Sequence, residues 1–309
     1  MTQTPPKQRS FKVKFFETLD DGEVRFDFAY FQQVFFLQIV ALLLLFSPMI
    51  GRRLHPAIPA GTPWGMAALQ TLMPWALLVG WTAVFYIVAA FFEWVFHRYL
   101  FHIIPNALAR KHTLHHYIHP IDNYHTHQEE QMESAHFPAH ALVAFLIVFS
   151  LATWPLQHWL PHQPILLAVN IAVCIGYYRY ELTHAQKHYS LTWQVQQLDN
   201  PRTGRKYEER FVLHFIHHDK DQYNMAIFAE DIKSFPDRLL GTFLQGRLLR
   251  DEQGHVVVKH EDGIPYFTIV LPEALPKPIG PVRLFDRLSL RWQKAFFRMY
   301  PHKRSHYHF

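Results

Sequence analysis

The chain has 309 residues, of which 50% are hydrophobic and 18% are charged, below the roughly 25% charge of an average soluble domain. No Asp, Glu, Lys or Arg occurs in residues 28–51, 54–92 or 134–178, which excludes a soluble globular domain, and the single cysteine, Cys174, excludes a disulfide scaffold and cysteine-ligated iron–sulfur clusters. The net charge of +5 comes from basic residues that flank apolar runs, so we expect an anionic membrane surface as a partner and no nucleic acid.

The first 30 residues are polar and contain two short stretches in which apolar and polar residues alternate. Residues 11–15 and 24–28 lie on either side of Asp20-Asp21-Gly22, which predicts a short β-hairpin ahead of the membrane. No apolar stretch with a small-residue cleavage site is present there, so we expect residues 1–30 to be a cytoplasmic segment and not a cleavable signal peptide.

Four segments have the length and apolar character of membrane-spanning helices. They are residues 31–50, 67–92, 137–154 and 165–180. We expect Arg52, Arg53 and Pro56 to end the first helix. The connector 154–164 carries three prolines and is typical of a tight turn or an interfacial segment.

Four crossings place the N-terminus, residues 97–136 and everything after about 181 on one side of the membrane. That side also carries most of the Lys and Arg residues, whereas the short loops on the other side hold only Arg52 and Arg53. Positive charge marks the cytoplasmic side. We therefore expect a multi-pass protein of the bacterial inner membrane or the endoplasmic reticulum, with its histidine-rich side in the cytoplasm.

Residues 244–309 are predicted to form a cytoplasmic tail. Residues 255–260 and 265–270 indicate a second hairpin, and four prolines in 272–281 indicate a stiff linker. Apolar residues recur at helical spacing from Phe285 to Met299, with Arg and Lys elsewhere around the wheel, as in a basic amphipathic helix. The expected fold is thus an all-α membrane protein with a helical cytoplasmic cap and short β-hairpins near the termini.

Histidine is the compositional outlier, with 23 residues in four conspicuous groups. The groups comprise His97 and His102; His112, His115 and His116; His184 and His188; and His214, His217 and His218. On a helix, each HxxHH group and the His184/His188 pair present their rings on one face. His97 and His102 are about 140° apart on an ideal helix, so they can converge only if the helix kinks or His102 lies at a frayed end.

All four groups are expected on the same side of the membrane, after the second and the fourth helix. Ten imidazoles in one place cannot all be protonated, and neutral imidazole is a metal ligand, so the pattern predicts a site for two metal ions. We consider as supporting groups the four nearest histidines, His125, His127, His136 and His140. The nearest carboxylates, which could orient the rings, are Glu93, Asp122, Glu181, Asp219 and Asp221.

The order HX4H, HX2HH, HX3H, HX2HH resembles that of the fatty acid hydroxylase superfamily, integral membrane dimetal oxygenases, and within it the fatty acid 2-hydroxylases. The resemblance covers about residues 85–243 and includes His97-Arg-Tyr-Leu-Phe-His102, Tyr180-Glu-Leu-Thr-His184 and Asp237-Arg-Leu-Leu-Gly-Thr242. It implies that residues 31–243 form a transmembrane dimetal hydroxylase domain in which all ten histidines are ligands. It further implies iron as the metal, with zinc possible in isolated protein, and dioxygen as co-substrate. A lipid acyl chain would be hydroxylated by the metal centre itself, with electrons from a separate cytochrome b5 or ferredoxin type protein.

Other functions remain open at this stage. A desaturase and a sterol or carotenoid oxidase share variants of the same histidine pattern. The polar, acidic stretch 125–134 departs from the 2-hydroxylases and leaves the lipid substrate open. A membrane metal-binding or transport protein and a bis-histidine haem protein are the non-hydroxylase alternatives.

Overall fold

The structure is a computed structural model that describes residues 9–15, 28–55, 57–119, 136–137, 140–226 and 234–301. The chain divides into two compact units, which we describe separately. Unit 1 comprises residues 1–26, 92–136 and 182–309, and unit 2 comprises residues 27–91 and 137–181. Two of the four boundaries between the units fall within long helices, α2 (Trp64–Val95) and α6 (Ile165–Gln186).

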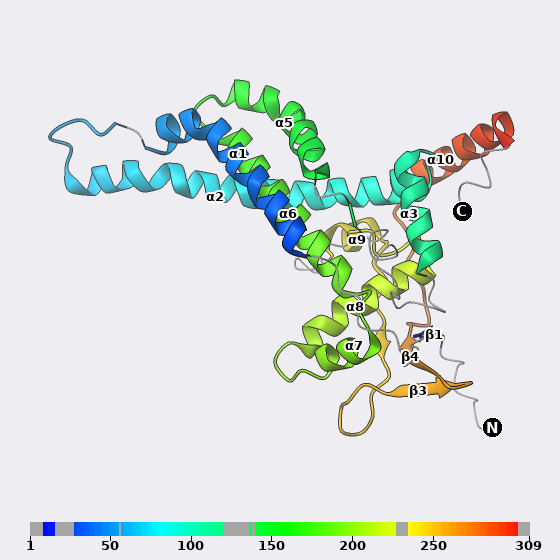
Figure 1. Cartoon of the computed structure of the whole chain (residues 1–309). Helices are drawn as coiled ribbons and strands as arrows, with labels where there is room; N and C mark the ends of the chain where they lie inside the picture. The colour runs from blue at the N-terminus through cyan, green and yellow to red at the C-terminus, as the bar shows by residue number, and fades with distance from the viewer. Residues whose placement is uncertain are drawn as a thin grey trace. The chain divides into compact units, whose positions relative to one another are not determined.

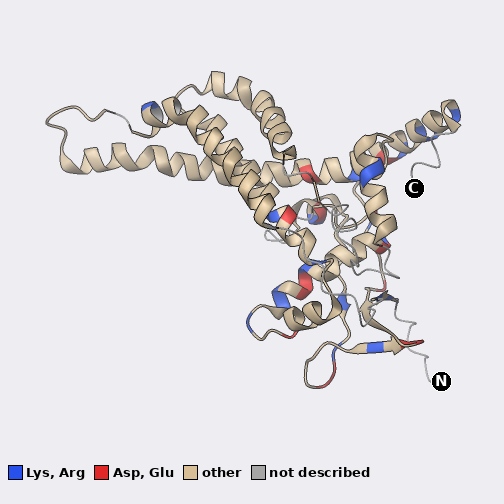
Figure 2. Ribbon diagram, viewed as in Figure 1, with Lys and Arg blue, Asp and Glu red and all other residues tan. Residues whose placement is uncertain are grey.

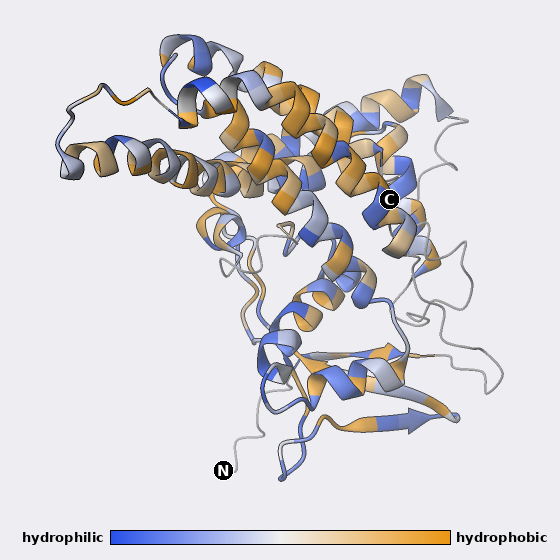
Figure 3. Ribbon diagram, turned by 60° about the vertical axis from the view of Figure 1, so that its left-hand side comes forward, coloured by the Kyte–Doolittle hydropathy of each residue, from blue (hydrophilic) through white to orange (hydrophobic). Residues whose placement is uncertain are grey.

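Unit 2 contains the apolar helices. Four helices in the described part of the chain are long and apolar enough to cross a membrane, which confirms the expected number: α1 (Phe28–Leu54), α2, α5 (Ala141–Trp159) and α6. Charged residues are almost absent from α1, α2 and α5 (Figure 2), and hydrophobic residues dominate the same helices (Figure 3). A protein of this kind belongs in a membrane, because such large apolar surfaces are not stable in water.

All four apolar helices have an end that differs from the prediction, and α6 continues beyond 180 to Gln186. The first helix continues through Arg52 and Arg53 to Leu54, and the third continues through Pro155 to Trp159. The second helix extends at both ends beyond 67–92, and it keeps Pro74 inside. Helices in apolar surroundings tolerate charges near an end and internal prolines, because neighbouring groups satisfy the freed backbone carbonyls.

Polar side chains fasten α6 within unit 2. The amide of Asn170 donates a hydrogen bond of 2.9 Å to Ser150 Oγ on α5, and Gln32 on α1 donates one of 3.2 Å to the Tyr178 hydroxyl. The ring of Phe31 stacks on that of Tyr177 at 6.0 Å between centroids. α6 is thereby the most enclosed of the four apolar helices, with 72% of its apolar window buried against 11–22% for the others.

Unit 1 combines short helices with a small antiparallel sheet (Figure 1). Its helices are α3 (Ala107–Ile118), α7 (Leu191–Leu198), α8 (Gly204–Asp219), α9 (Phe235–Leu240) and α10 (Gly280–Met299), and a π-helix, η1 (Phe96–Phe101), precedes α3. α10 confirms the predicted amphipathic helix.

The sheet pairs a strand near the N-terminus with strands from the C-terminal part of the chain. Its central strand, β4 (Ile264–Val270), pairs with β1 (Ser10–Lys14), β2 (Arg247–Leu248) and β3 (Val258–Glu261). The β3–β4 pair confirms the C-terminal hairpin. β1 pairs with β4, a partner that the sequence did not predict, and Phe28, the last residue of the predicted partner strand, belongs to α1. Residues 24–27 of the predicted partner strand lie outside the described residues. Strand pairing over this distance leaves no local sequence signal, because it depends on which apolar faces meet in the core.

The core of unit 1 lies between this sheet and α8. Phe15 and Phe267 from the sheet and Phe211 and Phe215 from α8 are fully buried there. The Phe15 ring is 5.4 Å from that of Phe267 and 6.4 Å from that of Phe215. The core thus fixes one face of α8, and the histidines of α8 lie on its other side.

Substitution Phe15→Ala tests whether β1 is part of this core. We expect a loss of about 3–5 kcal/mol in the free energy of unfolding, because the change leaves a cavity among aromatic rings. Thermal unfolding of the detergent-solubilised protein measures it, with the exposed Lys259→Ala as control. A midpoint for Phe15→Ala equal to that of the control would contradict the pairing of β1 with β4.

Candidate metal centre

The ten histidines predicted as ligands all belong to unit 1 and come together there. The structure forms one group of five, in which one ring nitrogen from each residue lies within 4.8 Å of the others: His115, His184, His188, His214 and His218. It forms a second group of four by the same measure: His97, His102, His112 and His217. We call them the first and the second cluster. His116, the tenth, contacts both, since its Nε2 lies 3.1 Å from His112 Nε2 and its ring stacks on His218 at 4.2 Å.

A π-helix, η1, brings together the two histidines of the first pair, His97 and His102. In η1 the backbone turn is wider than in an α-helix, and its hydrogen bonds join residues five apart. Residues i and i+5 therefore lie almost one above the other, and the rings of His97 and His102 are stacked at 5.2 Å with 18° between their planes. The HX4H spacing converges by this turn, an alternative to the kink or frayed end that the sequence suggested. Single π-turns are rare and frequently occur at functional sites.

Two α-helices carry the HxxHH groups. Asn106 begins α3 by accepting hydrogen bonds from the backbone N–H groups of Leu108 and Ala109, at 2.8 and 3.1 Å. α8 is amphipathic, with Phe211 and Phe215 in the core of unit 1 and His214 and His217 in the clusters. In both helices the three histidines follow at i, i+3 and i+4, so helix geometry alone brings their rings to one face.

The distances between ring nitrogens indicate a cage and not a set of hydrogen bonds. His112 Nε2 lies 3.0 Å from His97 Nε2, 3.1 Å from His102 Nε2 and 3.1 Å from His116 Nε2. A ring nitrogen has either one N–H or one lone pair, so these three contacts cannot all be hydrogen bonds. Nitrogens about 2.1 Å from a common cation would be about 3.0–3.4 Å apart. The second cluster therefore fits a metal ion, and His116 lies at its edge, beside His112.

The first cluster fits a second ion for a different reason. His115 is only 2% exposed, and neither of its ring nitrogens has a hydrogen-bond partner among the described residues. A buried polar atom without a partner costs about 1–3 kcal/mol, so a cation is the natural partner for one of these nitrogens. His214 Nε2 lies 3.2 Å from His188 Nε2, close to the ligand spacing of the second cluster.

Burial keeps these rings neutral. It lowers the pKa of His217 to about 4, against the opposing effect of the hydrogen bond to the Tyr223 carbonyl. Burial, reinforced by the charge that the neighbouring rings would carry, also holds the pKa well below its ordinary value at His102, His112, His115, His116, His188, His214 and His218. At neutral pH each of these residues therefore has a lone pair available for a metal ion.

Backbone carbonyls orient three of the rings. His97 Nδ1 donates to the Met225 carbonyl at 2.7 Å, His217 Nδ1 to that of Tyr223 at 2.9 Å, and His218 Nδ1 to that of His119 at 3.0 Å. A carbonyl only accepts, so Nδ1 carries the proton in each ring and Nε2 is left as the ligand atom.

Carboxylates, which the sequence suggested for this role, contribute less. Of the five candidates, Asp221 lies nearest to a cluster, with its Oδ2 4.0 Å from His102 Nδ1. Glu181 instead accepts a hydrogen bond of 3.3 Å from the backbone N–H of Phe137 in unit 2. Asp219 pairs with Lys220 at 2.7 Å, and Asp122 lies outside the described residues.

One buried carboxylate, that of Asp237, supports the ligand His97 indirectly, through the backbone. Asp237 accepts hydrogen bonds of 2.9 Å from the backbone N–H groups of Met225 and Ala226, and it also accepts from Thr242 and Trp94. It therefore fixes the peptide whose carbonyl holds His97. Burial raises the pKa of Asp237 to about 6, and its four donors partly offset that effect. Asp237 begins one of the segments that resemble the fatty acid 2-hydroxylases, but the sequence analysis predicted no role for it.

The structure adds one supporting histidine that the sequence did not suggest. His119 is fully buried, with its ring 4.4 Å from that of His188 and 5.0 Å from that of His115. Its position four residues after His115, on the same helical face, was the signal that could have found it. His136 is also buried, whereas His140 begins α5 in unit 2. His125 and His127 lie outside the described residues.

Comparison with protein-family models finds no match to the chain, and neither a characterised protein nor a solved structure shows significant similarity to it. The arguments for function therefore rest on the residues and their geometry.

The two clusters predict two metal ions for each chain. We expect His115→Ala to empty the first cluster and His217→Ala the second, so that each variant retains about one ion or fewer, because the buried cage loses a ligand. Metal analysis of purified protein after iron or zinc loading measures the ratio. The exposed His255→Ala is the control and should keep two ions. Two ions in both cluster variants would contradict the assignment.

Asp237 should influence the second cluster more than the first. Replacement by Asn places an amide N–H₂ group, a donor, opposite the N–H and O–H donors that bind the carboxylate. The 225–226 peptide then loses its hydrogen bond to residue 237, and His97, which is held by the Met225 carbonyl, loses its fixed orientation. We expect about 10- to 100-fold weaker metal binding at the second cluster. Competition with a chelator measures the affinity, and Asp251→Asn, in an exposed turn, is the control. Equal affinity in both variants would show that Asp237 serves stability alone.

Proposed function

We propose that the protein is a membrane-bound dimetal oxygenase, with iron as its metal, that hydroxylates the acyl chain of a lipid. The observation that carries this proposal is the convergence of ten imidazoles, eight of them buried, into two adjacent cages. The order and spacing of the four histidine groups, which resemble those of the fatty acid hydroxylase superfamily, support it. The four apolar helices supply the setting in which a lipid substrate is available.

The reaction sets clear demands on the chain. Hydroxylation inserts one atom of dioxygen into a C–H bond and reduces the other to water with two electrons and two protons. Iron ions, when bound, supply the redox chemistry that activates dioxygen. The imidazoles hold the ions, their Nδ1–H groups anchor them on carbonyls, and their burial excludes bulk water. An imidazole donor set also accepts zinc, which binds without supplying redox chemistry.

The electrons require a partner. The resemblance indicates a separate cytochrome b5 or ferredoxin type protein, which approaches from the side that carries the histidines. We place that side in the cytoplasm, because the N-terminal segment and the residues after 181 hold most of the Lys and Arg. The membrane is then the bacterial inner membrane or the endoplasmic reticulum.

The position of the ligands argues against metal transport. A transport path needs polar or ionisable ligands in the middle of the membrane. All ten ligands instead belong to unit 1, and none belongs to residues 27–91 or 137–181, which form most of the four apolar helices. Tandem HxxHH groups also differ from the single facing histidines that bind haem.

A lipid mass comparison tests the proposal. Cells that express the wild type, together with a suitable reductase, should accumulate a lipid class that has gained one oxygen atom. The same lipid should be absent in cells that express His217→Ala, because that variant lacks a ligand of the second cluster. Expression of His255→Ala controls for the general effect of a membrane protein.

Other outcomes would change the proposal. Loss of two hydrogen atoms from a lipid would indicate a desaturase, and an oxidised sterol or carotenoid would move the substrate to those classes. An unchanged lipid profile, in a host shown to contain all these lipids and a reductant, would contradict the oxygenase proposal and favour a metal-handling protein.

A further inference from the structure

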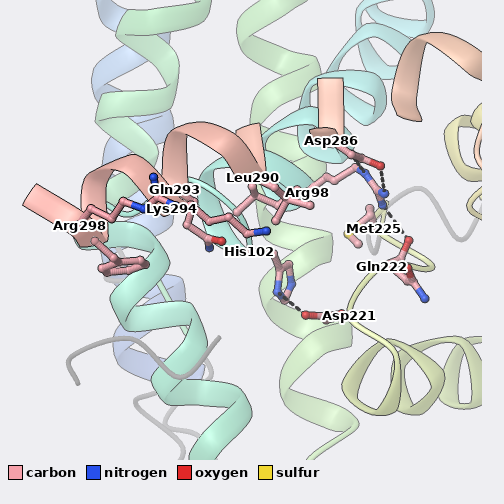
Figure 4. Close-up of a pocket in the computed structure, with 12 residues that line it drawn as sticks. Arg98, His102, Asp221, Gln222, Met225, Asp286, Leu290, Gln293, Lys294 and Arg298 are labelled. Carbon is pink, nitrogen blue, oxygen red and sulfur yellow. Dashed lines mark hydrogen bonds and ion pairs between the residues drawn. The ribbon is translucent and has the colours of Figure 1, made fainter. Parts of the chain in front are cut away.

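A pocket of about 700 Å³ lies beside the second cluster, within unit 1 (Figure 4). Its volume is in the range of small-molecule sites. His102, a ligand of the second cluster, lines it together with residues of η1, of the segment after α8 and of α10. α10 belongs to the C-terminal part of the chain, beyond the 85–243 stretch that carries the family resemblance, so the pocket is a feature of this chain's own tail.

One face of α10 forms a wall of the pocket. Asp286, Leu290, Lys294 and Arg298 follow one another at intervals of four residues and all line it. The basic residues Arg287 and Arg291 are not among the lining residues. At 100° per residue they project in nearly the same direction as Lys294 and Arg298, but they lie two turns nearer the start of α10, outside the pocket.

A buried ion pair holds α10 in place. The guanidinium of Arg98 donates from Nε and Nη2 to the two carboxylate oxygens of Asp286, at 2.9 and 2.7 Å, and from Nη1 to the Gln222 carbonyl at 2.8 Å. Arg98 is 4% exposed and follows the ligand His97 directly in η1. Bidentate pairs of this kind are strong and directional. They fix the position of α10 relative to the metal ligands.

The pocket has both a cationic and an apolar lining. Asp286 is paired with Arg98, whereas Asp221 Oδ2 lies 4.0 Å from Nδ1 of the neutral His102 ring, a contact that does not offset its charge. Lys294 and Arg298 have no acidic partner among the described residues. The apolar part of the lining consists of Ile103, Met225, Leu290 and Phe297. Figure 4 shows Lys294 and Arg298 on α10 and His102 with Asp221 on another side of the same pocket.

We propose that this pocket binds an anionic amphiphile, with its carboxylate or phosphate at Lys294 and Arg298 and its apolar chain against Ile103, Met225, Leu290 and Phe297, beside His102. The ligand satisfies two cations that lack acidic partners and covers four apolar side chains at once. A negatively charged protein would instead contact the exposed basic residues of α10 together, Arg287 and Arg291 included. The inference rests on the proposed function only in naming this ligand as the substrate of the metal centre.

Equilibrium binding tests the pocket directly. Full-length protein in phosphatidylcholine nanodiscs, both metal-free and zinc-loaded, is titrated at pH 8 with radiolabelled palmitate, palmitoyl-lysophosphatidate and uncharged hexadecanol. We expect palmitate or the lysophosphatidate to bind at least ~10-fold more tightly than hexadecanol. Preference for palmitate identifies a free carboxylate as the head group, and preference for the lysophosphatidate identifies a phosphate.

Matched variants of α10 locate the site. Lys294→Gln with Arg298→Gln should weaken binding of the preferred anion at least ~10-fold and leave hexadecanol within about 2-fold. Arg287→Gln with Arg291→Gln removes the same charge two turns earlier in α10, at positions that do not line the pocket, and should leave both affinities within about 2-fold. The exchange Lys294→Arg with Arg298→Lys keeps both charges, and it should retain most of the anion affinity.

Three outcomes would overturn the proposal. Equal loss in the two Gln pairs would indicate diffuse attraction of anions to a basic helix. Unchanged anion binding in both pairs would place the ligand elsewhere. Unchanged lipid binding with slower reduction by an acidic redox protein in the Lys294/Arg298 pair would indicate a protein-docking face. Because binding is measured without turnover, its failure is distinguishable from a failure to detect an oxygenated lipid.

Discussion

The structure depends on one constraint, the convergence of ten imidazoles, eight of them buried, in a single place. Ring nitrogens at 3.0–3.2 Å from one another cannot all share protons, and buried nitrogens without partners are costly. Two cations satisfy both conditions at once, provided that every lone pair points inward. The carbonyls of Met225, Tyr223 and His119 accept hydrogen bonds from Nδ1 of three rings, those of His97, His217 and His218. These bonds leave the lone pair on Nε2 of each ring directed into its cluster.

The other elements of unit 1 keep those rings aligned. The π-turn of η1 brings together two histidines that an α-helix would separate, and the aromatic core beneath α8 holds the opposite face of the helix that carries three ligands. Asp237 fixes the 225–226 peptide and so completes the support of His97. The metal centre is therefore supported by main-chain geometry and core packing more than by charged side chains.

The sequence predicted the parts of the structure that have a local signal. Charge-free runs marked the four apolar helices, and the 3.6-residue period of the α-helix placed the HxxHH groups and the amphipathic helix α10. It could not predict that β1 pairs with β4, since that register is decided by the core. Nor could it predict the π-turn, because the local sequence of residues 96–101 reads as a continuation of α2. Asp237 acquires its role only through tertiary contacts, whereas His119 could have been found from its position four residues after His115.

The pairing of β1 with β4 has a consequence for the order of assembly. Residues 10–14 are synthesised first, but their partner strand, residues 264–270, emerges near the end of translation. Contacts between such distant segments form slowly, because the chain between them must first be brought together. The apolar helices can enter the membrane while the ribosome is still at work, whereas the core beneath α8 closes only after the strand at 264–270 has been made. Metal loading is then a post-translational step, and the nascent histidines must stay free of adventitious ions until the last strand is in place.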